Sequence, residues 1–319
     1  MKGGTMKILI ALCAVFGLLL SANADAAHRH RHHHHHHHHH HRKSHIVKTS
    51  YRDLNEFRHQ TYPRLASYAA LIYDERNGEE LYSKHTDDIV PIASITKLMT
   101  AMVTLDANLP MNDVLQIEKE DVDMLRHSAS RLPVGTKLTR NEMLRLALMS
   151  SENRAAAALG HNYPGGIEAF VRAMNAKAKL LGMEHTHFVD STGLHSENVS
   201  TAQDLVKMVE AAYKYNVIRE DTTTSTHKIV LTTKHDRVLE YNNSNLLVKY
   251  KASNDWHIGL SKTGFINEAG HCLVMHSTIA AKPVVIVLLD SWGSRSRIGD
   301  ANRIRRWLRA RAEERKNFS

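Results

Sequence analysis

Along this 319-residue chain, the pattern of apolar and polar positions is typical of β-strands in two regions, residues 67–83 and residues 227–289. Between residues 67 and 83, two short apolar runs flank Asn77-Gly78, a pair typical of hairpin turns, so we predict two antiparallel strands there. Four later runs have the length and composition of strands. They span residues 227–232, 257–263, 271–279 and 283–289.

The chain between these two groups shows helical spacing instead. Thr139-x-x-Glu142 fits a capping box that opens a helix, and Ser200 is expected to cap another. The expected helices span residues 94–109, 143–149, 153–159, 167–181, 201–209 and 300–315. We therefore expect an α/β fold of the α+β kind, in which one antiparallel sheet carries helices and a helical insert occupies about residues 98–225.

The final helix, at residues 300–315, is rich in arginine. It could lie on a membrane surface, but its apolar stripe of Ile304, Trp307 and Leu308 is narrow. We therefore favour packing of this stripe on the sheet, with the basic face in solvent.

The first 26 residues have the pattern of a secretory signal peptide. Lys2 and Lys7 precede an apolar run at residues 8–20, and Ala24-x-Ala26 fits a cleavage site. The run is too short to span a bilayer comfortably, so an uncleaved anchor is the less favoured alternative. Export to the periplasm is thus expected. Cleavage would leave only Cys272, and hence no intramolecular disulfide.

Residues 27–60 are expected to be a disordered linker, because their His-rich composition cannot form a core. Neutral imidazoles at this density would bind transition metals such as Zn, Ni or Cu, although a solvated spacer is the favoured interpretation. The candidate metal ligands form one unbroken run: His32, His33, His34, His35, His36, His37, His38, His39, His40 and His41. The remaining residues, 61–319, are predicted to form one domain.

The net charge of +9 comes mostly from these N-terminal segments. The predicted domain itself is only mildly basic. This distribution argues against a nucleic-acid-binding protein, which would carry a strongly basic face on the domain.

Ser94 and Lys97 form the first candidate catalytic pair. A serine hydroxyl needs a base to accept its proton near neutral pH, and residues i and i+3 of a helix share one face. The helix is mostly apolar, and burial of a lysine lowers its pKa and favours the neutral amine. The spacing alone is weak evidence, because Ser225 and Lys228 repeat it in a polar stretch.

Two further motifs supply polar groups for a substrate. Ser151 and Asn153 lie between two predicted helices, where a hydroxyl can relay a proton and an amide can hold a peptide bond. The segment Lys262-Thr263-Gly264 ends a predicted strand, and a glycine there lets the strand approach a ligand closely. Each motif is weak alone, since Ser196-Glu197-Asn198 repeats the serine-asparagine pattern.

Taken together and in this order, the three motifs resemble the active-site set of penicillin-binding proteins and serine β-lactamases. Longer segments resemble the D-alanyl-D-alanine endopeptidase branch of the low-molecular-mass penicillin-binding proteins (the penicillin-binding protein 7 type, serine peptidase family S11). These segments are residues 90–102, 147–156, 174–179, 262–265 and 269–275. The resemblance covers about residues 65–310, so the His-rich linker lies outside it, and Val90 replaces an arginine common in the family.

The resemblance implies a β-lactamase/transpeptidase-like fold with a five-stranded antiparallel sheet and a helical subdomain. It also implies that Ser94 is the nucleophile, Lys97 its base and Ser151 the proton relay to the leaving amine. Substrate binding falls to Asn153, Lys262, Thr263, Gly264 and Phe265, with backbone N–H groups of Ser94 and Phe265 as the oxyanion hole. Peptidoglycan is the implied partner and β-lactams are the implied inhibitors. No cofactor is implied.

Three alternatives remain open at this point. A D-Ala-D-Ala carboxypeptidase that trims pentapeptides uses the same motifs. A class A β-lactamase is less favoured, because residues 188–205 resemble D-Ala-D-Ala peptidases and not the carboxylate loop that such an enzyme needs. A catalytically silent metal-buffering or β-lactam-sensing protein is motivated only by the His tract.

Overall fold

The computed structural model describes residues 62–231 and 237–317. All the described residues belong to one compact unit, which lies within Thr49–Ser319. The predicted signal peptide at 1–26, the predicted linker at 27–60 and its His tract lie outside the described residues, so these expectations stay predictions.

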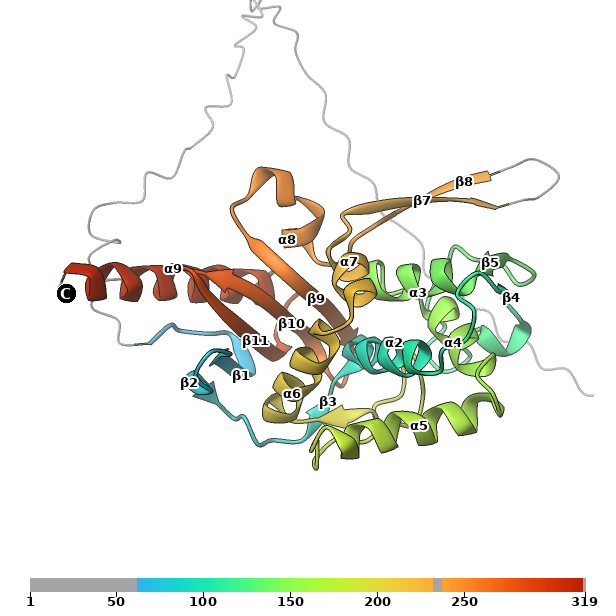
Figure 1. The fold of residues 1–319 in the computed structure, drawn as a ribbon, viewed down its shortest axis with the longest axis horizontal. Coiled ribbons are helices and arrows are strands. Elements are labelled where there is room, and N and C mark those ends of the chain that lie inside the picture. The colour runs from blue at the N-terminus through green and yellow to red at the C-terminus, as the bar shows by residue number, and fades with distance from the viewer. Residues whose placement is uncertain (1–61, 232–236, 318–319) are drawn as a thin grey trace, which may run out of the picture. The chain divides into compact units, whose positions relative to one another are not determined.

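A five-stranded antiparallel sheet forms the centre of the described unit (Figure 1). Its strand order is β2-β1-β11-β10-β9, so the early hairpin pairs with the late strands through β1 and β11. The strands are β1 (Ser67–Asp74), β2 (Glu79–Lys84), β9 (His257–Ile266), β10 (Gly270–Ile279) and β11 (Lys282–Ser291). Gly78 turns the β1–β2 hairpin with a φ of 72°, a conformation that glycine adopts without strain.

Both faces of this sheet are buried, because successive side chains of a strand point to opposite faces. One face packs Ile72, Met275 and Ile286 against the final helix α9 (Ser296–Asn317), through Ile304 and Trp307. The other face packs against helix α6 (Ala202–Tyr213) and the helical part. The favoured packing of the final helix on the sheet is therefore observed.

The segment between β2 and β9 is mostly helical and is called the helical part here. Its buried apolar side chains pack together with those on one face of the sheet. Its helices include a 3₁₀ turn, η1 (Ala93–Thr96), which leads directly into α2 (Lys97–Asp106). The others are η2 (Lys119–Asp121), α3 (Arg140–Met149), α4 (Asn153–His161), α5 (Gly166–Leu180), α7 (Asn216–Thr223), α8 (Leu246–Lys249) and η3 (Lys251–Ser253).

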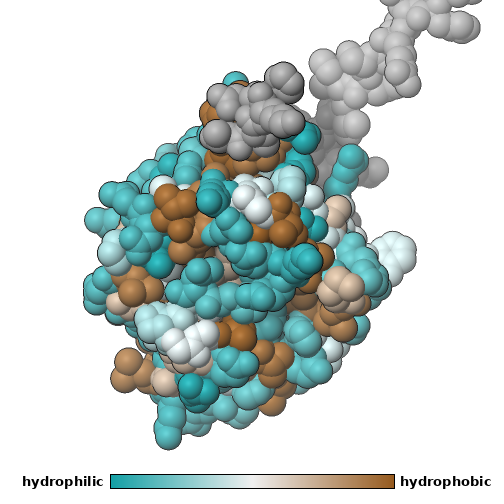
Figure 2. All heavy atoms as spheres, turned by 90° about the vertical axis from the view of Figure 1, so that its right-hand side faces the viewer, coloured by the Kyte–Doolittle hydropathy of each residue, from teal (hydrophilic) through white to brown (hydrophobic). Residues whose placement is uncertain are grey.

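The face of the molecule at the right of Figure 1 is mostly hydrophilic with small scattered apolar patches (Figure 2).

Three short antiparallel pairs complete the secondary structure of residues 62–231 and 237–317. They are β3 (Val90–Pro91) with β6 (Val199–Ser200), β4 (Val114–Gln116) with β5 (Lys137–Thr139), and β7 (Thr226–Leu231) with β8 (Arg237–Asn242). The predicted strand at 227–232 is thus β7. It pairs with β8, which the sequence analysis missed, in a hairpin separate from the main sheet.

Several predicted boundaries need correction. Ser94 lies in the 3₁₀ turn η1, so the α-helix begins at Lys97 and not at Ser94. Thr201, and not Ser200, caps α6, because its side chain accepts a hydrogen bond from N of Asp204. The final helix begins four residues earlier than expected, at Ser296. The capping box of α3 forms as predicted between Thr139 and Glu142. No helix among the described residues is long and apolar enough to cross a membrane.

Candidate active site

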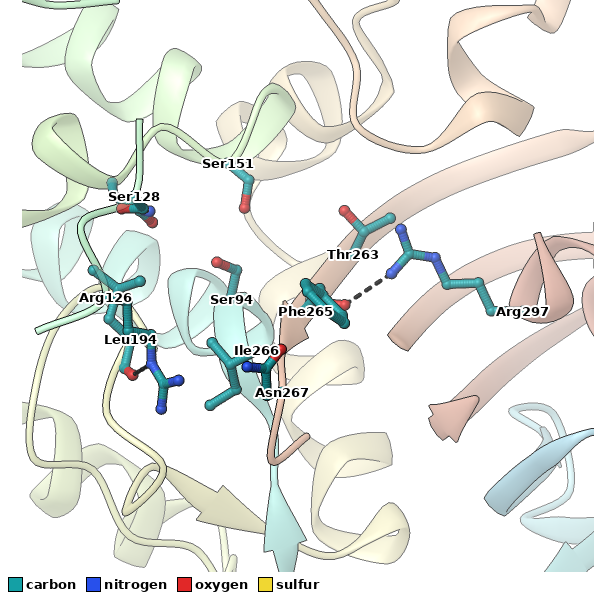
Figure 3. Close-up of a pocket in the computed structure, with 12 residues that line it drawn as sticks. Ser94, Arg126, Ser128, Ser151, Leu194, Thr263, Phe265, Ile266, Asn267 and Arg297 are labelled. Atoms are coloured by element: carbon teal, nitrogen blue, oxygen red, sulfur yellow. Dashed lines mark hydrogen bonds between the residues drawn. The ribbon is translucent and has the colours of Figure 1, made fainter. Parts of the chain in front are cut away.

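A cavity of about 420 Å³ lies where η1, the turn between α3 and α4, and the end of β9 meet (Figure 3). Ser94, Ser151, Asn153, Thr263 and Gly264 all line it. These residues are up to 170 positions apart in the chain, and the fold brings them together around one cavity.

Lys97 holds the centre of this site with its side chain fully buried. Its Nζ lies 2.8 Å from Oγ of Ser94, 2.8 Å from Oδ1 of Asn153 and 2.6 Å from O of Thr192. Burial lowers the pKa of Lys97 to about 8, against the opposing charges of Asp190 and Glu152. A neutral amine has two hydrogens and one lone pair. The amide and carbonyl oxygens accept the two hydrogens, and the lone pair is left to face the Ser94 hydroxyl.

The backbone around Ser94 is held in an unusual conformation. Ala93, immediately before it, has a φ of 48°, in the left-handed region that non-glycine residues rarely adopt. Gly193 packs against this turn so closely that a Cβ there would lie 2.0 Å from O of Ala93. The strained turn therefore depends on the loop at residues 190–194, which also supplies the Thr192 carbonyl to Lys97.

Asp190 and Asn198 organise that loop. The Asp190 carboxylate accepts hydrogen bonds from N of Thr192, at 2.8 Å, and from N of Gly193. Buried Asn198 accepts from N of Val189 and donates to O of Asp190 and to Oγ1 of Thr96. Asn198 belongs to the second serine-asparagine motif, so that motif has a positioning role outside the cavity.

Ser151 and Lys262 form a second hydroxyl–amine pair. Ser151 occupies the turn between α3 and α4 with a φ of 62°, which points its side chain toward the cavity. Nζ of Lys262 lies 2.7 Å from Oγ of Ser151 and donates to O of Thr263. Burial, with the nearby charges of Lys97 and Arg297, lowers the pKa of Lys262 well below its ordinary value. This pair can pass a proton to or from a group bound in the cavity.

Strand β9 is the edge strand of the sheet on the cavity side. Gly264 brings it against the nucleophile, since a Cβ there would lie 2.8 Å from O of Ile92 and 3.2 Å from N of Ser94. An edge strand offers backbone N–H and C=O groups with which an extended peptide can pair. Phe265, half exposed, stacks on His271 at the cavity rim.

Arg297 is a functional candidate that the sequence analysis missed. It comes from the start of α9 and reaches the cavity, where its Nη1 donates to O of Gly264 at 2.8 Å and to O of Cys272 at 3.0 Å (Figure 3). No salt bridge to it occurs among the described residues, and burial lowers its pKa. A half-buried guanidinium that lines a cavity and has no carboxylate partner is suited to bind an anionic ligand. No motif surrounds Arg297, and only the packing of α9 on the sheet reveals it.

Ser225 and Lys228, which repeat the spacing of Ser94 and Lys97, do not line this cavity. Lys228 is exposed on β7, and its Nζ lies 3.5 Å from Oε2 of Glu240 on β8, so it takes part in a surface ion pair. Within residues 62–231 and 237–317, no group of three or more His, Cys, Asp or Glu side chains could hold a metal ion.

Comparisons with known proteins agree with this geometry. Residues 56–293 match the peptidase S11 family profile, described as D-alanyl-D-alanine carboxypeptidase. A D-alanyl-D-alanine endopeptidase of Pseudomonas aeruginosa is 51% identical over 244 residues, which are 76% of this chain and 77% of that protein. A D-alanyl-D-alanine endopeptidase of Escherichia coli is 47% identical over 246 residues, covering 77% of this chain and 78% of that protein.

Solved structures give the same answer for the fold. The Streptomyces K15 DD-transpeptidase superposes with a TM-score of 0.71 at 30% identity, covering 77% of this chain and 98% of that one. Penicillin-binding protein D2 of Listeria monocytogenes, solved in a cefotaxime-bound form, gives a TM-score of 0.66 at 28% identity and covers 78% and 99%. The expected β-lactamase/transpeptidase-like fold is confirmed. The chain belongs to peptidase family S11, the D-alanyl-D-alanine carboxypeptidase family, and is a serine DD-peptidase.

Proposed function

We propose that this protein is a periplasmic DD-endopeptidase that cleaves D-alanyl cross-links of peptidoglycan through an acyl-enzyme on Ser94. The observation that carries the chemistry is the buried Lys97 amine 2.8 Å from the Ser94 hydroxyl. Two relatives, matched over about three quarters of their length at 51% and 47% identity, are both described as D-alanyl-D-alanine endopeptidases, which supports the choice of bond. The signal-like pattern of residues 1–26 supports export.

Acylation begins when the lone pair of Lys97 takes the Ser94 proton and Oγ attacks the carbonyl carbon of a D-alanyl peptide bond. Gly264 allows β9 to lie against N of Ser94, so that N–H groups of Ser94 and Phe265 can both reach the developing oxyanion. One donor of this kind contributes about 2.7–4 kcal/mol to transition-state stabilisation. The C–N bond then breaks.

The leaving amine needs a proton, and we assign its donation to the Ser151 hydroxyl. Oγ of Ser151 lies 2.7 Å from Nζ of Lys262. Lys262 replaces the proton that Ser151 gives away, because its own amine is buried and bonded to that hydroxyl. Asn153 bonds to Lys97 and Ser128, which fixes its amide to align the acyl part of the substrate. Water attack on the acyl-enzyme completes the hydrolysis.

The carboxylate next to the leaving amine is assigned to Arg297 and Thr263. Lys262, which the resemblance also assigns to substrate binding, has a buried Nζ that bonds to Oγ of Ser151 and to O of Thr263. Arg297 presents its guanidinium to the cavity beside Thr263 (Figure 3). Both a terminal D-alanine and the D-centre of a cross-link carry such a carboxylate. This shared feature keeps carboxypeptidase activity as the second candidate, in line with the family description.

β-Lactams are proposed to acylate Ser94 by the same route, because their strained amide takes the place of the D-alanyl bond. The cefotaxime-bound form of the Listeria protein supports this, since that protein shares the fold. Covalent labelling of the mature enzyme, and its loss in Ser94→Ala, would test the claim directly.

The function itself is tested with purified muropeptides. A mixture of DD-cross-linked dimer and monomeric pentapeptide is digested with the enzyme and with Ser94→Ala. Ser94-dependent loss of the dimer is expected. Loss of terminal D-alanine from the pentapeptide with an intact dimer would instead establish a carboxypeptidase, and no change in either would contradict both candidates.

A further inference from the structure

Arg126 lines one end of the cavity and forms an ion pair there with Glu268, which neighbours the lining residue Asn267. Nη1 of Arg126 lies 2.9 Å from Oε2 of Glu268, and their side chains are 21% and 48% exposed. Arg126 belongs to a loop of the helical part, and Glu268 lies in the turn between β9 and β10. The ion pair therefore joins the two walls of the cleft, at a place that solvent and ligands can reach.

This end lies across the nucleophile from Arg297. In β9, Thr263 precedes Gly264, which lies against N of Ser94, and Asn267 comes directly after the end of the strand. Arg297 approaches the cavity beside Thr263, whereas Glu268 is next to Asn267. Figure 3 accordingly draws Arg126 and Arg297 on opposite sides of Ser94.

These positions give a bound peptide a direction. Under the proposed function, the carboxylate beside the leaving amine lies at Arg297. The acyl part, which precedes the scissile bond, then extends along β9 toward Asn267 and reaches the Arg126–Glu268 pair. The residue just before the reacting D-alanine is the one whose side chain can arrive there.

We propose that Arg126 and Glu268 form a second recognition subsite for a side chain that ends in both an ammonium and a carboxylate group. The substrate carboxylate binds the Arg126 guanidinium, and the substrate ammonium binds the Glu268 carboxylate. This inference rests on the proposed function, because it assumes which end of the substrate lies at Arg297.

Charge balance explains why one end group should carry both charges. In the free enzyme, Arg126 and Glu268 neutralise each other across the cleft. A ligand with only a carboxylate would bind Arg126 and leave Glu268 unpaired. A ligand with only an ammonium would bind Glu268 and leave Arg126 unpaired. A zwitterionic end exchanges one ion pair for two, so that no charge loses its partner.

Arg126 is held ready for this role. The Asp123 carboxylate accepts hydrogen bonds from N of Leu125 and N of Arg126, both at 2.9 Å, and another from N of Ser128. Nε of Arg126 donates to O of Leu194. The Nε edge of the guanidinium is thereby fixed against the loop at residues 190–194, and Nη1 faces Glu268. A preorganised guanidinium loses little freedom when it binds a carboxylate.

The test uses four versions of one peptide ending in D-Ala-D-Ala, which differ only in the side chain before the first D-alanine. That residue is 2,6-diaminopimelic acid with a free end, with an amidated carboxyl, with an acetylated amine, or with both groups capped. We measure kcat and KM for each peptide, and also the rate of penicillin acylation, which requires no such side chain.

The wild-type enzyme is expected to prefer the free zwitterion over each singly capped peptide by about tenfold in kcat/KM, mainly through KM. Glu268→Gln should lose the preference for the free amine, and Arg126→Gln the preference for the free carboxylate. Arg126→Lys should recover part of the carboxylate preference. The control Glu240→Gln removes a surface ion pair of β7 and β8 and should leave all ratios unchanged.

Equal kcat/KM values for the four peptides, with penicillin acylation intact, would overturn the subsite and leave the proposed function standing. If the variants slowed hydrolysis of all four peptides and penicillin acylation alike, the Arg126–Glu268 pair would only support the structure of the cleft. That result would also overturn the subsite. If the wild-type enzyme reacted with penicillin but hydrolysed none of the peptides, the proposed function would fail and the subsite with it.

Discussion

Nζ of Lys97 and O of Thr192 are 2.6 Å apart, although the two residues are separated by 95 positions in the chain. This contact orients the base. Together with the bond to Asn153, it occupies both hydrogens of a neutral amine and leaves the lone pair for Ser94. The loop that carries Thr192 is therefore part of the catalytic apparatus.

Lys97→Arg should abolish acylation although it preserves the positive charge. A guanidinium stays protonated at any relevant pH and cannot accept the Ser94 proton. We expect the rate of labelling by a fluorescent penicillin to fall by about 10³-fold or more, within the range that loss of a general base produces. Lys228→Arg is the matched control, because Lys228 has the same spacing from a serine but is exposed. Rapid labelling of a folded Lys97→Arg protein would refute the base assignment.

Acylation should rise with pH through a midpoint near 8. Burial lowers the pKa of Lys97 to about 8, and only the neutral amine can take a proton. About one lysine in ten is then neutral at pH 7 and about half at pH 8, so the rate should increase roughly fivefold between them. Stopped-flow penicillin acylation between pH 6 and 9.5 measures this. A flat profile in that range would contradict a titrating Lys97.

Arg297→Gln should weaken substrates that carry a carboxylate beside the leaving amine. The variant loses a charge-assisted bond, and kcat/KM for a D-Ala-D-Ala peptide is expected to drop by about 10- to 100-fold. The same peptide with a C-terminal amide should lose much less, so the acid-to-amide ratio is the quantity to measure. Equal losses on both peptides would indicate that Arg297 only supports β9 through O of Gly264.

Gly264→Ala should impair acylation while the protein stays folded. The added Cβ would lie 2.8 Å from O of Ile92, a backbone atom that cannot move without shifting η1 or β9. Either shift moves the oxyanion-hole donors, so we expect about a 10²-fold or greater loss in acylation rate.

Gly299→Ala is the matched control for that experiment. Gly299 lies in α9, and the nearest atom to its added Cβ is the end of the flexible Arg303 side chain, at 3.5 Å. Alanine is favoured over glycine in helices by about 1 kcal/mol, so the melting temperature should rise slightly and the acylation rate should not change. Normal acylation by Gly264→Ala would show that the close approach of β9 is dispensable.

Much of this protein could be read from local patterns. The i,i+3 spacing of Ser94 and Lys97 fixes their contact whether the turn is α-helical or 3₁₀, because side chains three residues apart lie on one face in both. The β1–β2 hairpin and the α3 capping box depend on neighbours in sequence, and they formed as predicted. The family resemblance, carried by short motifs, supplied the fold.

The tertiary structure alone decided the rest, because those contacts join distant segments. Nothing near Arg297 or Arg126 in the sequence marks them, and each reaches the cavity only because α9 packs on the sheet or a loop of the helical part faces β9. The place of β7 outside the main sheet depends on its partner β8. The lowered pKa of Lys97 likewise follows from burial, a property of the whole fold and not of the Ser-x-x-Lys motif.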